Sequence, residues 1–204
     1  MGENMIKNII FDIGNVMLEF DPKTYVKSKI GEDKLEEIYK CIFQSEEWPM
    51  LDRGVITEKE AIKNIVSRNF ENENLLNMVL ENWYEMLIQI ETSVDILRKL
   101  KEKKYNVYYL SNFHLAAFEY INKKYGLFEL FNGGVVSYKE KLLKPEKEIY
   151  EKIIKKYKLE IDSTVFVDDM EENVEAAIKL GLKGIVLKNP LNLRIELEKL
   201  NISI

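Results

Sequence analysis

The stretch Met5–Phe11 (MIKNIIF), followed at once by Asp12, decides the fold, because a short apolar run ends there at a carboxylate. Three more polar groups stand at comparable places further along the chain: Ser111 and Asn112, Lys144 and Pro145, and Asp168 and Asp169. In a parallel α/β sheet the carboxyl ends of the strands lie along one edge, where ligands bind. The sequence therefore predicts one crevice that is surrounded by a carboxylate, a hydroxyl, an ammonium group and a carboxylate pair.

Strands and helices are predicted to alternate along most of the chain. Each predicted strand is brief, rich in Val, Ile or aromatic residues, and bounded by Gly, Asn, Asp or Lys. The five predicted strands are Lys7–Phe11, Asn106–Leu110, Gly134–Ser137, Thr164–Val167 and Lys183–Leu187. Apolar residues at helical spacing follow Pro145, which suits a first helical position, and recur in Glu172–Leu180 and Leu191–Leu200. This alternation predicts an α/β fold with a three-layer, Rossmann-like parallel sheet as its core.

A helical insertion is predicted between the first two strands. The interval from Asp12 to Ser111 far exceeds the roughly twelve residues that a crossover needs, and it holds no convincing strand. We therefore expect residues 1–17 and 91–204 to form the core, and residues 18–90 to form a helical cap over the carboxyl edge of the sheet. A cap in this position can act as a lid that excludes water and recognises substrate.

Local signals support helices in and after this insertion. Thr57 with Glu60 has the spacing of a capping box ahead of a helix. Apolar residues between positions 75 and 90 recur at helical spacing. Thr92 with Asp95 has the spacing of a second capping box, which predicts the start of the helix that leads to the second strand.

Composition and charge limit the classes of function. The chain has 204 residues and a formal net charge of −5, so it offers no basic field for nucleic acid or for an anionic membrane. Its single cysteine, Cys41, excludes an intrachain disulfide and fits a reducing compartment. The longest uncharged run, Tyr105–Phe118, is too short to span a bilayer. We therefore expect a soluble cytoplasmic protein, and the sequence gives no indication of its oligomeric state.

Four short motifs in a fixed order resemble the haloacid dehalogenase superfamily of aspartate-nucleophile hydrolases. They are Phe-Asp-Ile-Gly-Asn-Val (11–16), Leu-Ser-Asn (110–112), Lys-Pro (144–145) and Val-Asp-Asp-Met-Glu-Glu-Asn (167–173). The resemblance spans essentially the whole chain and includes a helical cap after the first motif. The first motif is similar to that of a branch that includes bacterial glucose-1-phosphate phosphatases. The resemblance implies a capped phosphatase acting on a small phosphorylated metabolite, with a sugar phosphate as one option.

The resemblance also implies roles for the acidic residues. Asp12 is the expected nucleophile, because a carboxylate can attack phosphorus and form an aspartyl-phosphate that water later hydrolyses. Attack on an anionic phosphate requires a cation, and Mg²⁺ prefers oxygen ligands. Asp12, the backbone carbonyl of Gly14 and Asp169 are expected to hold the ion, with Asp168 beside them. The alternative is that the acidic pair only caps a helix, and Asn173 either orients one of its carboxylates or lies exposed.

The remaining expected site residues bind phosphate or substrate. Ser111, with Asn112, is expected to hold phosphate oxygens near a helix start, where a serine also serves as a simple N-cap. Lys144 is expected to neutralise the phosphate oxygens and the nucleophile. Arg53, in a turn of the cap, is a candidate for substrate recognition or an ordinary surface arginine. His114, the only histidine, is either a substitute proton donor or a packing residue.

Gly14 departs from the pattern of most phosphatases in the superfamily. Those enzymes have an aspartate two positions after the nucleophile as general acid and base, which typically supplies about 10²–10⁴-fold in rate. Without it, rates are expected to depend steeply on the acidity of the leaving group. The glycine leaves open a catalytically retired member that binds a phosphorylated ligand or protein. A haloacid dehalogenase is disfavoured, because those enzymes act without metal and the acidic pair Asp168 and Asp169 would then have no role.

Overall fold

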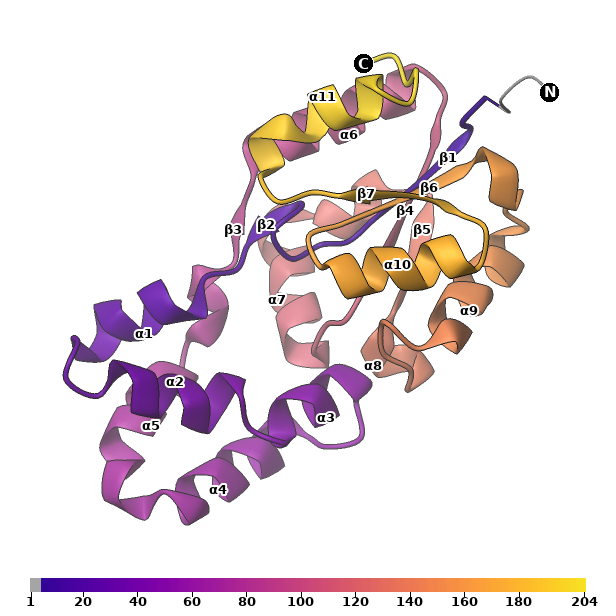
Figure 1. Cartoon of the computed structure of the whole chain (residues 1–204). Coiled ribbons are helices and arrows are strands. Elements are labelled where there is room, and N and C mark those ends of the chain that lie inside the picture. The colour runs from indigo at the N-terminus through magenta and orange to yellow at the C-terminus, as the bar shows by residue number, and fades with distance from the viewer. Residues whose placement is uncertain (1–4) are drawn as a thin grey trace.

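Five parallel strands form the central sheet of the computed structural model, which describes residues 5–204 (Figure 1). Their order is β5-β4-β1-β6-β7, so the strand that ends at Asp12 occupies the centre. The strands are β1 (Asn8–Phe11), β4 (Asn106–Ser111), β5 (Gly133–Val136), β6 (Thr164–Asp168) and β7 (Lys183–Val186). All five strands predicted from the sequence are therefore confirmed, with ends that differ by no more than one residue.

Helices cover both faces of this sheet, and this confirms the three-layer prediction (Figure 1). Along β1, Ile9 and Phe11 belong to the apolar cluster that includes the buried residues of α6 and α11. Ile10 points the other way and joins the cluster that includes α9 and α10. The helices of this core are α6 (Glu91–Glu102), α7 (Leu115–Tyr125), α8 (Ser137–Glu140), α9 (Lys147–Tyr157), α10 (Glu171–Lys179) and α11 (Leu193–Glu198). Its single turns of 3₁₀ helix are η3 (Leu127–Leu130), η4 (Ile161–Ser163) and η5 (Pro190–Asn192).

A second group of helices lies apart from the sheet and is joined to it by two chain crossings (Figure 1). It contains α1 (Pro22–Ile30), α2 (Leu35–Phe43), α3 (Glu47–Arg53), α4 (Glu58–Arg68), η1 (Phe70–Asn72), α5 (Glu73–Leu80) and η2 (Trp83–Met86). The crossings pair as a two-stranded antiparallel ribbon of β2 (Leu18–Glu19) and β3 (Ile88–Gln89). The expectation that this interval holds no strand was wrong, because two-residue strands are too short to show an alternating pattern.

One of the two expected capping boxes forms. The Thr57 hydroxyl accepts from the backbone N–H of Glu60, whose carboxylate accepts in return from the N–H of Thr57. The second expectation was wrong, because α6 begins at Glu91, and Ile90 is its N-terminal cap with no side-chain hydrogen bond. Thr92 therefore lies inside the first turn, where its side chain cannot act as the cap.

Two further local expectations need correction. The apolar stripe of residues 75–90 is not one helix: α5 ends at Leu80, and Asn82, whose backbone is not helical (φ −137°), separates it from η2. Asn is a weak helix former, so its position at this break is expected. Pro145 is not the first residue of a helix, since α9 begins at Lys147 with Glu146 as its N-terminal cap.

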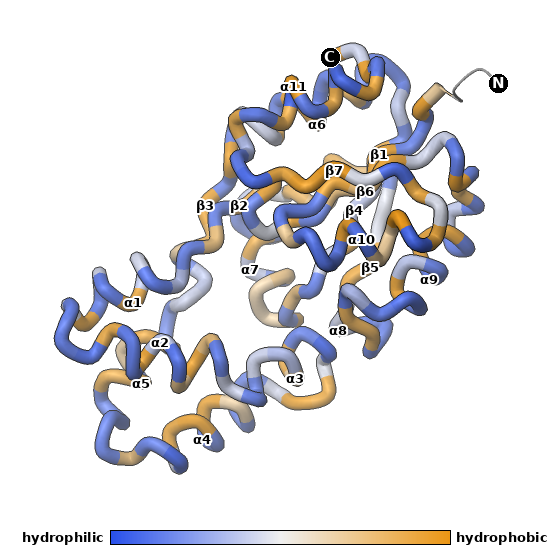
Figure 2. The backbone as a smooth tube through the Cα atoms, in the orientation of Figure 1, coloured by the Kyte–Doolittle hydropathy of each residue, from blue (hydrophilic) through white to orange (hydrophobic). Residues whose placement is uncertain are grey.

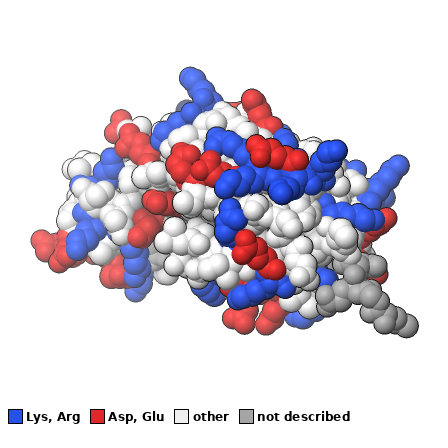
Figure 3. Space-filling model, turned by 90° about the horizontal axis from the view of Figure 1, so that it is seen from above, with Lys and Arg blue, Asp and Glu red and all other residues white. Residues whose placement is uncertain are grey.

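The hydropathy of the chain follows this architecture. The strands of the sheet are largely apolar, whereas the helices alternate between apolar and polar residues along their length (Figure 2). On the face seen in Figure 3, acidic and basic side chains are interspersed. Within residues 5–204, no helix combines the length and the apolar character that a bilayer crossing requires.

Candidate active site

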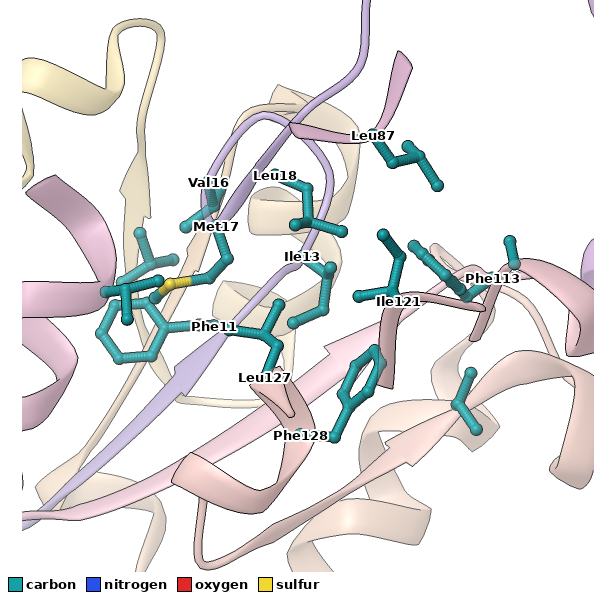
Figure 4. Close-up of a cluster of buried hydrophobic side chains, with 14 of the residues drawn as sticks. Phe11, Ile13, Val16, Met17, Leu18, Leu87, Phe113, Ile121, Leu127 and Phe128 are labelled. Carbon is teal, nitrogen blue, oxygen red and sulfur yellow. The ribbon is translucent and has the colours of Figure 1, made fainter. Parts of the chain in front are cut away.

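Asp12 lies directly after β1 at the carboxyl edge of the sheet. Its backbone N–H donates to the carbonyl of Val167 in β6 at 2.8 Å, which fixes the residue beside the neighbouring strand. The turn that follows rests on the core, because Ile13, Val16 and Met17 are fully buried among apolar side chains (Figure 4). The Asp12 side chain is thus held at the bottom of a cavity by a rigid turn rather than by a mobile loop.

Lys144 contacts two carboxylates at the bottom of this cavity. Its Nζ lies 2.7 Å from Oδ1 of Asp12 and 2.6 Å from Oδ2 of Asp168. Burial lowers the pKa of Lys144, but the two carboxylates raise it, and the net pKa is raised. Asn112 holds the lysine from behind, since its amide accepts from the Lys144 N–H at 2.8 Å and donates to the Lys144 carbonyl at 3.0 Å. The expected lysine is therefore in place as a cation, and Asn112 orients it.

Burial raises the pKa of Asp12 to about 7, with Lys144 opposing the shift and Asp168 adding to it. A buried carboxylate is costly unless cations compensate its charge. Lys144 is shared between two carboxylates, so its single positive charge does not neutralise both of them. The site accordingly favours a further cation next to Asp12.

Asp168 is saturated with hydrogen bonds. Besides the Lys144 ammonium, it accepts from the backbone N–H of Met170 at 2.8 Å and from Nδ2 of Asn173 at 3.1 and 3.2 Å. Of the two alternatives for Asn173, the structure shows the contact with the acidic pair, and Asn173 is buried. Because both oxygens of Asp168 have protein donors, this carboxylate is suited to anchoring Lys144 and the start of α10.

Asp169 is the more accessible member of the acidic pair. Its Oδ2 accepts from Nδ2 of Asn15 at 3.0 Å. Burial raises its pKa, and the Asn15 hydrogen bond opposes that shift. Asp12, Asp168 and Asp169 each offer an oxygen, and these oxygens all lie within 4.8 Å of one another. Such a set fits a hard divalent cation, and Gly14 lines the same cavity.

Ser111 is the last residue of β4, is buried and lines the same cavity. It does not cap a helix, because α7 begins only at Leu115 and its N-terminal cap is His114. The expected serine is thus brought next to Asp12, although the expected helix start lies further along the chain.

Arg53 is not brought to the cavity, which the described residues line without it. Its guanidinium forms a two-pronged ion pair with Glu146 and donates to the carbonyl of Lys141 at 3.1 Å. These bonds join the end of α3 to the core. The residue expected to recognise substrate therefore fastens the helical group to the sheet-bearing part of the chain.

The upper wall of the cavity is mainly apolar and aromatic. The cavity has a volume of about 240 Å³. Its apolar lining residues are Phe20, Trp48, Trp83, Leu87, Phe113, Ala117 and Met170. Four of these seven come from the 18–90 segment, so this segment supplies much of the surface that a ligand would meet opposite the carboxylates.

His114 is buried between the rings of Trp48 and Trp83, at centroid distances of 4.5 and 5.2 Å. Its Nε2 lies 3.2 Å from Oδ1 of Asp52. Burial lowers the pKa of His114 to about 3, and a backbone hydrogen bond at Trp48 opposes the shift only slightly. An imidazole with such a pKa is uncharged at neutral pH. The option that His114 donates a proton in place of a residue at Gly14 is therefore not supported.

Two residues of the site were not singled out from the sequence. Asn15 adopts a left-handed φ of 52° and bonds to Asp169. Asp52 reaches the cavity from α3. Both stand next to positions that were considered, namely Gly14 and Arg53. The sequence could not identify them, because it does not show which side of a turn or helix faces a cavity.

The three-layer parallel sheet has an acidic cavity at its carboxyl edge, where α/β proteins of this architecture bind their ligands. A family model described as haloacid dehalogenase-like hydrolase matches residues 6–181. The chain therefore belongs to the haloacid dehalogenase-like hydrolases, as the four motifs predicted.

Two curated relatives have phosphatase names. The chain is 28% identical over 194 residues to a sesquiterpene phosphatase of Aspergillus oryzae, with 95% of this chain and 96% of the relative covered. It is 26% identical over 207 residues to a D-ribitol-5-phosphate phosphatase of Bacteroides thetaiotaomicron, with 95% and 97% covered.

Solved structures agree with the fold. A family enzyme from Bacteroides thetaiotaomicron, in a complex with magnesium and inorganic phosphate, superposes with a TM-score of 0.72 at 27% identity, covering 89% of this chain and 93% of that one. An L-2-haloacid dehalogenase of Xanthobacter autotrophicus gives a TM-score of 0.63 at 15% identity, covering 94% of this chain and 82% of that one, and shares the fold alone.

Proposed function

We propose that the protein is a Mg²⁺-dependent phosphatase that cleaves a small phosphorylated metabolite through an aspartyl-phosphate on Asp12. The observation that carries this proposal is the ammonium group of Lys144, which lies within 2.7 Å of both Asp12 and Asp168. A buried lysine between two carboxylates neutralises charge where an anionic phosphate would meet an anionic nucleophile.

Each residue of the cluster has a part in this chemistry. Asp12 attacks phosphorus from the bottom of the cavity, and the leaving alcohol departs toward the opposite wall, because attack and departure are roughly in line. Lys144 and the hydroxyl of Ser111 bind the phosphate oxygens. Asn112 and Asp168 keep Lys144 in position through the bonds described above.

The metal ion is proposed from the donor set. Asp12, Asp169 and the carbonyl of Gly14 would hold Mg²⁺, with Asp168 adjoining them. When bound, the ion neutralises negative charge on the phosphate and on the nucleophile. The family enzyme of Bacteroides thetaiotaomicron that was crystallised with magnesium and phosphate supports this choice.

The apolar wall of the cavity favours a substrate whose alcohol part is apolar or planar. Phe20, Trp48 and Trp83 offer ring faces and edges, whereas a sugar would need several hydrogen-bonding partners. The relative named a sesquiterpene phosphatase fits this preference, and the relative named for ribitol phosphate fits a polyol. A sugar phosphate remains a prediction that a substrate panel tests. We propose residues 18–90 as the lid over this cavity.

Hydrolysis of para-nitrophenyl phosphate, with Mg²⁺ and with a chelator, tests the proposed function. We expect turnover that requires the metal and that disappears in Asp12→Asn. No turnover of the aryl phosphate or of a panel of phosphorylated metabolites would support a retired, ligand-binding member. Release of halide from 2-haloacids without metal would instead identify a dehalogenase.

A further inference from the structure

Asp52 is a carboxyl group in the active-site cavity that the proposed chemistry has not used. It lies one residue before the end of α3 and lines the same cavity as Asp12 and Lys144. Its side chain is 18% exposed, and its Oδ1 lies 3.2 Å from Nε2 of His114. Asp12 is at the end of a strand of the sheet, whereas Asp52 belongs to the helical group. The cavity is therefore lined by carboxyl groups from both parts of the chain.

The backbone of Asp52 is fixed to the core by a relay through Ser137. The Ser137 hydroxyl donates to the carbonyl of Asp52 and accepts from the backbone N–H of Phe113 at 2.9 Å. Phe113 lies two residues after Ser111, in the loop that forms the bottom of the cavity. Ser137 thus holds the backbone of Asp52 at a fixed position relative to the phosphate-binding loop after Ser111.

The two following residues strengthen this attachment. Arg53 is held by Glu146, and the carbonyl of Gly54 accepts from Nζ of Lys141. Gly54 has a φ of +65°, and a Cβ at this position would lie 2.5 Å from the carbonyl oxygen of Tyr138. Only glycine permits so close an approach, so residues 52–54 are docked on the core in one defined arrangement.

Gly14, on the side of the cavity near Asp12, has no side chain. A Cβ at this position would meet nothing within 4 Å. Most phosphatases of the superfamily have their general acid at this position, whereas this chain supplies no carboxyl group there. Asp52 is the remaining acidic lining residue that belongs to the helical group.

We propose that Asp52 donates the proton to the leaving alcohol oxygen, in place of the carboxyl group that is missing at Gly14. This inference rests on the proposed phosphatase function. The leaving oxygen is opposite the attacking oxygen of Asp12, which is the side on which the helical group closes the cavity. His114 then acts as a positioning residue behind the carboxyl group of Asp52.

The protonation state of the residues supports this assignment. Burial raises the pKa of Asp52 to about 8, Lys144 opposes the shift, and Asp12 adds to it. At neutral pH the group is therefore largely a neutral acid with a proton to give. His114 faces it as an uncharged base, so Lys144, Asp12 and His114 are the titratable groups that set its behaviour.

The proposed first step transfers the phosphoryl group from the alcohol to Asp12 and a proton from Asp52 to the alcohol. An oxygen of Asp12 forms a bond to phosphorus, and the bond between phosphorus and the alcohol oxygen breaks with its electron pair on that oxygen. The carboxyl proton of Asp52 moves to the oxygen, which gives a neutral alcohol and leaves Asp52 as a carboxylate. In the second step this carboxylate takes a proton from the water that attacks phosphorus, which releases inorganic phosphate and restores both residues.

The decisive variant is Asp52→Asn, measured in single turnover on phosphate esters of graded leaving-group acidity at saturating Mg²⁺. Asp162→Asn, on the opposite edge of the sheet, is the matched control. We expect Asp52→Asn to slow esters of ordinary primary alcohols by about 10²–10⁴-fold and para-nitrophenyl phosphate by less than about tenfold. The wild type should show a shallow dependence on leaving-group acidity, and the variant a steep one.

A pH profile of the wild type gives a second readout that needs no variant. With an alkyl phosphate, the rate should fall as pH rises through the pKa of Asp52, because the proton is lost. With the aryl phosphate this fall should be much weaker. A parallel fall for both esters would assign the titration to another group and overturn the inference.

The two proposals fail in different ways. If the wild type hydrolyses no phosphate ester in a metal-dependent manner, the proposed function fails. If the wild type is active and Asp52→Asn slows aryl and alkyl esters equally, the function stands and the role of Asp52 is refuted. A steep dependence already present in the wild type would likewise refute it.

Discussion

The two sides of the cavity differ in how their polar groups are satisfied. On the core side, Lys144 and Asp168 are buried, and each forms several ion pairs or hydrogen bonds. These contacts together fix the positions of both side chains. On the side of the helical group, Nε2 of His114 lies 3.2 Å from Oδ1 of Asp52, and the imidazole packs against aromatic rings. Neither ring nitrogen of His114 has a well-aligned hydrogen bond among the described residues. One side is therefore built for charge, and the other for an apolar ligand and a neutral proton donor.

This difference indicates that the two sides of the cavity have different functions. In the proposed mechanism, the saturated hydrogen-bond network around Lys144 fixes the groups that act on phosphate, and this network tolerates little change. A wall of rings with few polar contacts can accept different alcohols without loss of the chemistry below it. Substitutions on the two sides should accordingly change different quantities.

Asp12→Asn should have the largest effect, because it removes the nucleophile with almost no change in volume. We expect turnover to fall by at least about 10³-fold, while the far-ultraviolet circular dichroism matches that of the wild type. Retention of a substantial fraction of activity would exclude an aspartyl-phosphate mechanism.

Lys144→Met should affect both activity and stability, because it leaves Asp12 and Asp168 buried without their cation. Breaking such a buried pair typically costs about 3–5 kcal/mol of the free energy of unfolding. Urea unfolding at neutral pH in the absence of metal measures this. Lys139→Met, an exposed lysine of α8, is the control, and equal stability of the two variants would show that the network is not structural.

Asp169→Asn should change metal binding much more than folding, since Asp169 is only partly buried and Lys144 keeps both of its carboxylate partners, Asp12 and Asp168. We expect the Mg²⁺ concentration for half-maximal activity to rise about 10–100-fold. The midpoint of thermal unfolding without metal should shift little. An unchanged Mg²⁺ dependence would reduce Asp169 to a partner of Asn15.

His114→Phe tests the side of the cavity formed by the helical group. It should have the smallest effect on stability at neutral pH. The folded-state pKa of His114 is depressed to about 3 from 6.5, so its contribution to stability is present above pH 6.5 and is lost as pH falls toward 3. Between pH 6.5 and pH 3, the free energy of unfolding of the wild type should therefore fall by up to about 4 kcal/mol more than that of the variant. Phenylalanine keeps the contacts with Trp48 and Trp83. Stability curves that run parallel would contradict a buried neutral histidine.

The sequence predicted the core side well because most of its groups stand at the ends of strands, and Lys144 is marked by the Lys-Pro motif. Asp12, Ser111 and Asp168 stand at strand ends that apolar runs mark clearly, and parallel strands bring such ends to one edge. The helical side was predicted only as a group of helices. Whether Asp52 or Arg53 faces the cavity depends on the rotation of α3 and on the docking of Gly54 against Tyr138, and neither leaves a periodic pattern in the sequence.

The side chain of Asn15 joins the two parts of the molecule through one rigid amide. Its Oδ1 accepts from the backbone N–H of Phe20, where the helical group begins, and its Nδ2 donates to Asp169. A movement of the helical group at Phe20 would rotate the amide and withdraw its hydrogen bond from the carboxylate. Mg²⁺ titration of Asn15→Ala would detect this coupling as an altered metal affinity. If the proposed lid opens and closes, the hydrogen bonding of Asp169, and with it the affinity for a cation, would then depend on the position of the helical group.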